Sequence, residues 1–159
     1  MMKKSLSACL LSSALLVGCG NTNEADVEGC EHIKEGPGVS VTATASASGA
    51  PAVSNDHKRY DITLPTGSGG NSGSVSFAVS ETSHYAFFLS ADVNLGIAST
   101  TGASSVAFES AAKSSNVCTE IKGRYVAELL VGTYTLTFGP TSQSSVSLVI
   151  EEEGVEHEH

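Results

Sequence analysis

The side chains of this sequence that are best suited to bind a metal ion are its histidines. Two of the five, His157 and His159, close the chain and alternate with glutamates. In an extended backbone, residues two positions apart face the same side with Cα atoms roughly 6–7 Å apart, so both imidazoles could reach one ion. Neutral imidazole is a common zinc ligand and also suits copper. Two ligands make a weak site, so we expect an earlier histidine to supply a third.

His32, His57 and His84 are the candidates for that third ligand. His32 ranks first because it follows Cys30 by two positions, and a disulfide at Cys30 would hold its backbone in place. The sequence thus predicts a zinc or copper site at His157, His159 and His32. The alternative is that the last residues form a solvated, frayed end with no ligand.

Motifs of catalysis are missing from the sequence. It contains neither a Gly-x-Ser-x-Gly elbow nor a His-Glu-x-x-His helix motif, and Gly70-Asn71-Ser72-Gly73 only faintly resembles a serine-protease loop. The run from Asp92 to Gly96 begins like a calcium loop, but Ala103 occupies the position where that loop needs an acidic ligand. We therefore expect a protein that is not an enzyme.

The first eighteen residues have the pattern of an export signal. Lys3 and Lys4 precede an apolar stretch from Leu6 to Val17, and the small Gly18 follows it. This stretch is shorter than the roughly 18–20 residues that a membrane-spanning helix needs, and no later segment is as apolar, so we expect no transmembrane helix.

The run Leu16-Val17-Gly18-Cys19 resembles the lipobox of bacterial lipoproteins. The resemblance implies cleavage before Cys19, lipidation of its thiol and a protein held at a membrane by acyl chains. Gly20, in place of an aspartate after the cysteine, implies localisation in the cell envelope at the outer membrane. The alternative is an ordinary secretory signal in which the cysteine occurs by chance.

Size and charge limit the remaining possibilities. Cleavage would leave 141 of the 159 residues, which suits one domain. The removed segment carries two lysines, so six basic and seventeen acidic residues remain and the net charge becomes −11. Such a negative chain would not attract nucleic acid. The expected partners are the membrane, through the lipid on Cys19, and an envelope protein.

The cysteines predict a disulfide. Of the four, Cys9 would leave with the signal and Cys19 would carry lipid, so Cys30 and Cys118 remain as a pair in an oxidising compartment. Two thiolate ligands of a metal ion are the competing interpretation, although a Cys-x-x-Cys pair is missing.

The rest of the chain alternates with a period of two. One example is Tyr60, Ile62 and Leu64, which are separated by polar residues, and the run from Tyr85 to Leu89 is apolar on both faces and is typical of a central strand. The pattern predicts an all-β fold, an antiparallel, jelly-roll-like β-sandwich of about eight or nine short strands. Only Ser110 to Ser115 could form a helical turn.

We divide the chain into four parts: a signal peptide at 1–18, the lipidated Cys19 and a flexible acidic tether at 19–37, the β-sandwich at 38–153 and a Glu/His tail at 154–159.

Four segments of the sandwich are similar to the bacterial pre-peptidase C-terminal domain, over roughly residues 72–151. They are Val75-Ser76-Phe77, Tyr85-Ala86-Phe87-Phe88-Leu89, Asp92-Val93-Asn94-Leu95 and Gly132-Thr133-Tyr134-Thr135-Leu136-Thr137-Phe138. The resemblance implies a small jelly-roll sandwich of the kind appended to secreted enzymes as a non-catalytic module.

The sequence thus predicts a lipid-anchored, non-enzymatic β-sandwich of the cell envelope that acts as a binding or structural module. The alternative is a lipoprotein that binds zinc or copper through its histidine-rich tail.

Overall fold

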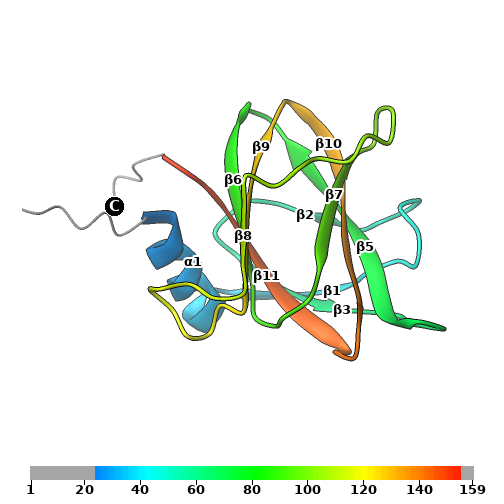
Figure 1. Ribbon diagram of the computed structural model, residues 1–159, viewed down its shortest axis with the longest axis horizontal. Helices are drawn as coiled ribbons and strands as arrows, with labels where there is room; N and C mark the ends of the chain where they lie inside the picture. The colour runs from blue at the N-terminus through cyan, green and yellow to red at the C-terminus, as the bar shows by residue number, and fades with distance from the viewer. Residues whose placement is uncertain (1–23, 155–159) are drawn as a thin grey trace, which may run out of the picture.

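A computed structural model describes residues 24–154 as two packed β-sheets with one helix on the outside (Figure 1). The first sheet has the order β1-β3-β11-β6-β9-β8, with bounds Gly38–Thr42, Arg59–Thr63, Ser145–Glu152, Ser83–Leu89, Gly123–Leu129 and Ser110–Ala112. The second has the order β2-β5-β10-β7, with bounds Ala52–Val53, Gly70–Val79, Gly132–Thr141 and Leu95–Ser99, and β4 (Thr66–Gly67) pairs with β5. The prediction of a β-sandwich is confirmed.

The sheets differ from the prediction in three details. β1 pairs with β3, and β2 with β5, in parallel, so both sheets are mixed rather than antiparallel throughout. The described residues contain eleven strands instead of eight or nine, because very short strands such as β2 and β4 are too brief to show an alternating pattern. The helical turn expected at Ser110 to Ser115 is wrong, since β8 begins there and pairs with β9.

The main core lies between the sheets and is built from the alternating apolar positions. Phe77 of β5 contacts Tyr85 and Phe87 of β6 edge to face, with ring centroids 5.4 and 6.0 Å apart. Such pairs add to the stabilisation from burial alone. The prediction that the run Tyr85 to Leu89 forms a central strand is confirmed, because β6 lies between β11 and β9.

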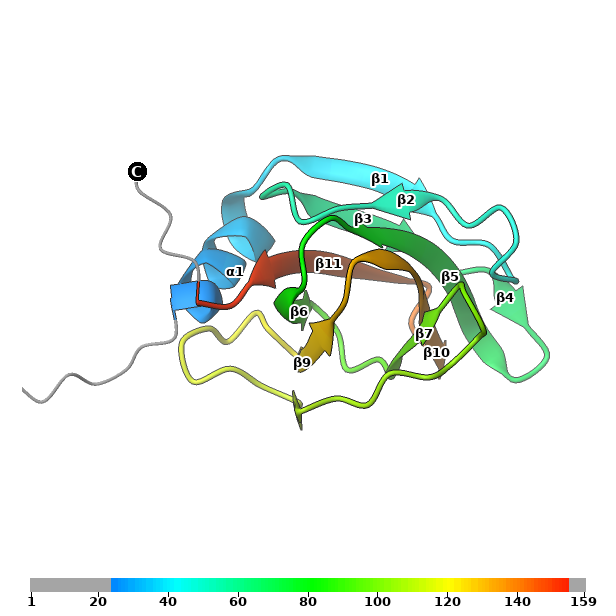
Figure 2. The same cartoon turned by 90° about the horizontal axis from the view of Figure 1, so that it is seen from above.

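A second, smaller core explains why β6 is apolar on both faces. The outward residues Ala86, Phe88, Val126 and Val149 of the six-stranded sheet pack beneath helix α1 (Glu24–Glu35) and the 118–121 segment. Figures 1 and 2 both show α1 beside β11. The flexible tether predicted over these helical positions is therefore wrong, while residues 19–23 lie outside the described part of the chain.

Polar contacts fix both ends of α1. Arg124 of β9 donates from Nε to Asp26 Oδ1 and from Nη2 to Glu153 Oε1, each at 2.6 Å. At the other end, Arg59 Nη1 donates to the carbonyl oxygen of Ile33 at 3.2 Å, which satisfies a helix-terminal acceptor. Glu24 and Asp26 in the first turn and Lys34 in the last complement the helix dipole. The acidic composition that resembled a tether is also compatible with a docked helix.

Within residues 24–154, no helix has both the length and the apolar character needed to cross a membrane.

Candidate metal centre

Three side chains from distant parts of the chain meet beside α1. They are His32 of α1, His57 of the loop before β3 and Glu151 of β11, and one ligand atom from each lies within 4.8 Å of the others. His32 Nδ1 is 2.7 Å from Glu151 Oε1, and His57 Nδ1 is 3.4 Å from Glu151 Oε2. The two imidazole rings are 5.3 Å apart between centroids. One carboxylate thus faces two histidines, each through a different oxygen.

Glu151 is buried because of its place in β11. It follows Val149 on the sheet face that α1 covers, and only 1 % of its side chain is exposed. Burial raises its pKa above the ordinary 4.5; the hydrogen bond with His32 and the charges of His32 and His57 oppose that effect without cancelling it, and the nearby Glu28 adds to it. The ionised carboxylate is therefore poorly compensated by its protein neighbours alone.

His57 is held in an uncommon backbone conformation. Its φ of 58° lies in the left-handed region, which non-glycine residues seldom occupy. Side-chain bonds brace the turn around it, since the Tyr60 hydroxyl donates to Asp56 Oδ1 at 2.8 Å and lies 2.9 Å from Ser54 Oγ. Burial raises the pKa of Asp56, but hydrogen bonds from Lys58 and Tyr60 outweigh burial and hold it below 3.8. The loop thus keeps a strained residue at the cluster.

The chemistry of this cluster is that of a three-ligand metal site. Two imidazole nitrogens with one carboxylate are a known zinc set, which leaves a fourth position for water or another ligand, and imidazole also suits copper. A metal ion held by both residues would take the place of the hydrogen bond between His32 and Glu151. The exposed fractions of His32 and His57 are 20 % and 47 %, so the cluster opens to solvent on the histidine side.

The predicted site residues divide into two groups. The structure brings His32 into the cluster, together with His57, which had been one of the possible third ligands. His157, His159 and Cys19 lie outside residues 24–154, so their predicted roles stay predictions. Glu151 was not predicted as a member of the cluster. Its signal in the sequence is a carboxylate directly after three consecutive apolar residues of a doubly covered strand.

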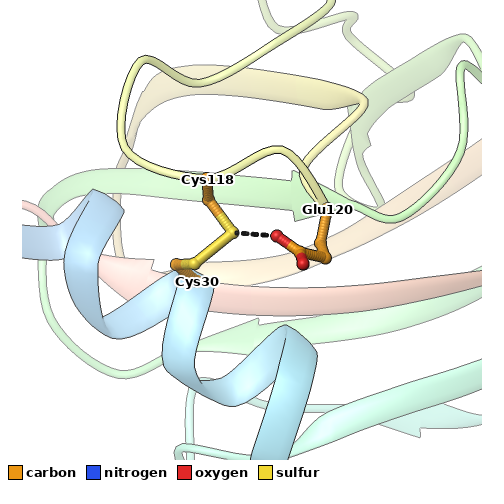
Figure 3. A group of neighbouring side chains, drawn as sticks. All are labelled: Cys30, Cys118 and Glu120. Carbon is orange, nitrogen blue, oxygen red and sulfur yellow. Dashed lines mark hydrogen bonds between the residues drawn. A yellow bond between two sulfur atoms is a disulfide. The ribbon is translucent and has the colours of Figure 1, made fainter.

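The predicted disulfide between Cys30 and Cys118 is confirmed (Figure 3). It joins α1 to the loop before β9, with Cα atoms 5.6 Å apart. Glu120 Oε2 lies 3.3 Å from Cys118 Sγ, but a disulfide sulfur carries no proton to donate, so this is a contact rather than a hydrogen bond. Because the two sulfurs are bonded to each other, the alternative of two thiolate metal ligands is wrong for this oxidised form.

Fold and cluster together define a β-sandwich with a candidate two-histidine, one-carboxylate metal centre. No protein-family model matches the chain, and no curated protein sequence matches it. The resemblances to bacterial lipoproteins and to the pre-peptidase C-terminal domain therefore stay predictions from the sequence.

Proposed function

We propose that this protein is a lipid-anchored, non-enzymatic β-sandwich of the bacterial cell envelope that captures a divalent transition-metal ion, zinc or copper. The observation that carries the proposal is the convergence of His32, His57 and Glu151 within 4.8 Å. The three side chains come from a helix, a loop and a strand, so they meet only in the folded protein. A buried carboxylate between two imidazoles supplies the charge and the nitrogen ligands that these ions prefer.

The shape of the cluster suits capture and release. Glu151 anchors the site from within the fold, and the half-exposed His57 leaves a route from solvent to the ion. The tail can contribute, because His157 follows Glu151 by six residues and six extended residues reach roughly 20 Å. A tail histidine would fill the fourth position of a zinc ion, in line with the interpretation of His157 and His159 as ligands.

The proposed anchor fits the position of the helix. Cys19 precedes Glu24, the first residue of α1, by five positions, a span of at most roughly 18 Å. A lipid on Cys19 would therefore hold the sandwich close to the membrane surface. Metabolic labelling with a radioactive or alkyne-tagged fatty acid tests this part, since Cys19→Ala abolishes the label if Cys19 is the lipidated residue.

Calorimetric titration with zinc and with copper tests the metal part. It uses residues 20–159, which contain every helix and strand that the structure describes, in a non-chelating buffer. We expect a micromolar or tighter event that disappears in His57→Ala and Glu151→Gln and survives in the control Glu31→Gln, a substitution of an exposed helix residue. A tight event that survives both substitutions but disappears in a His157→Ala, His159→Ala protein would move the site to the tail.

A further inference from the structure

A second group of ligand side chains lies on the same sheet, outside the candidate metal centre. His84 is the second residue of β6, Glu128 is its direct partner on β9, and Glu109 immediately precedes β8. His84 Nε2 is 3.3 Å from Glu109 Oε1, and one ligand atom from each of the three residues lies within 4.8 Å of the others. All three side chains are exposed, with His84 and Glu109 at 48 % and 49 %.

This group and the candidate metal centre are neighbours. Glu151 pairs with Ala86, and His84 stands two residues before Ala86, so both side chains project from the same face of the sheet. The chain after β11 remains hydrogen-bonded to β6 at His84, because Glu153 donates its backbone N–H to the carbonyl oxygen of His84 at 2.8 Å. Diagonal neighbours of this kind have Cα atoms roughly 7–8 Å apart.

We propose that His84, Glu109 and Glu128 form a second site for a divalent transition-metal ion, weaker than the first and open to solvent. The backbone already places the three residues together. The pairing of β6 with β9 sets Glu128 opposite His84, and the backbone N–H of Glu109 donates to the carbonyl oxygen of Val126 in β9. The imidazole nitrogen selects against calcium and magnesium, which prefer oxygen ligands.

The second site binds more weakly because its ligands are exposed to solvent. The exposed carboxylates keep water around them, and ordering three exposed side chains costs rotamer entropy. Glu151, by contrast, is already desolvated and fixed. The second site therefore exchanges its ion quickly and holds it within a few residues of the buried carboxylate. The second site could pass its ion on to the first site, and that role depends on the proposed function. The ability of the second site to bind metal does not depend on it.

Zinc titration of four proteins tests the second site. All contain residues 20–159 and carry His157→Ala and His159→Ala, which removes the tail ligands. The reference protein shows two events, His84→Ala loses the weaker and keeps the stronger, and His57→Ala loses the stronger and keeps the weaker. The control Glu31→Gln keeps both. Calcium at the same concentrations gives no event that His84→Ala removes.

Two results overturn the second site. One is a single binding event in the reference protein that His84→Ala leaves unchanged, and the other is a weaker binding event that persists in His84→Ala. Failure of the proposed function looks different, because the stronger event then survives His57→Ala while the weaker one still responds to His84→Ala. Copper(II) gives an independent readout in the His57→Ala protein, which lacks the first site: its paramagnetism broadens the amide resonance of Glu128 at low occupancy, and adding His84→Ala removes that broadening.

Discussion

His32 Nδ1 and Glu151 Oε1 lie 2.7 Å apart although 119 positions separate the two residues in the chain. The contact joins α1 to β11. It places the buried carboxylate of the cluster against a helix that the disulfide also holds. The candidate metal centre therefore depends on docking of the helix, and a change in either residue or in the helix should alter binding at the centre.

Replacement of the buried carboxylate should abolish binding at the centre without unfolding the protein. Glu151→Gln keeps the size and one hydrogen-bonding oxygen but removes the negative charge. We expect zinc affinity to fall at least about 100-fold, or about 2.7 kcal/mol. The control is Glu152→Gln, because the next residue of the strand faces the other way. Equal zinc affinity of Glu151→Gln and the wild type by calorimetry, with unchanged circular dichroism, would rule out Glu151 as a ligand.

The same substitution has a predictable effect on the metal-free protein as pH changes. The pKa of Glu151 is raised above 4.5 in the folded state, chiefly by burial. The folded protein thus binds more protons than the unfolded chain between 4.5 and the raised pKa, and the free energy of unfolding falls as pH rises through that window. Glu151→Gln lacks this loss. In urea unfolding with a chelator present, the free energy of unfolding of the variant should rise relative to that of the wild type above about pH 4.5. A difference that stays constant with pH would contradict the prediction.

His57 offers a test of strain at the centre. Its φ of 58° is comfortable for glycine and costs other residues about 1 kcal/mol. His57→Gly and His57→Ala both remove the imidazole, so both should lose zinc, but only glycine relieves the strain. We expect the glycine variant to be about 1 kcal/mol more stable than the alanine variant in denaturant unfolding. Equal stability would mean that the loop relaxes around any side chain.

The sequence predicted the sandwich better than the site, and particular residues show why. Alternation at Tyr60, Ile62 and Leu64 is a local signal, and it predicts correctly because this segment buries one face in the main core. No local signal shows that these residues form a cluster, since His32, His57 and Glu151 meet only through tertiary folding. The docked helix was not predicted, because few of its twelve residues are apolar and glycine disfavours a helix. The reason for Gly29 becomes clear only in the structure, where Phe88 packs directly against it.

Gly29 tests whether close docking of α1 positions His32. A Cβ added at Gly29 would lie 2.5 Å from Phe88 Cε2, and Phe88 is fully buried. Gly29→Ala should therefore destabilise the protein by about 1–3 kcal/mol, despite the better helix propensity of alanine. It should also weaken zinc binding, because His32 lies one turn further along. Val27→Ala, at a position that is 43 % exposed, is the control and should change neither property. A Gly29→Ala protein as stable as the wild type would show that the helix is loosely attached.

The disulfide should stabilise the fold and the metal centre together. It links residues 88 positions apart and fastens α1, which carries His32, to the loop before β9. Cys30→Ala with Cys118→Ala should lower the free energy of unfolding by about 4–5 kcal/mol on the chain-entropy model. The helix would then undock more often, so we expect weaker zinc binding in the double variant even where the sandwich remains folded.

Zinc binding separates the two effects of losing the disulfide, which are a lower free energy of unfolding and more frequent undocking of α1. An ion that binds only the folded state adds stability in proportion to the logarithm of its concentration over Kd. If the helix must dock for His32 to bind, saturating zinc raises the midpoint of urea unfolding of the double variant and increases amide protection within α1. Adding Glu151→Gln to the double variant should remove both responses. If zinc stabilises the double variant but leaves exchange in α1 unchanged, the ion does not need His32, and the site must be built from other ligands.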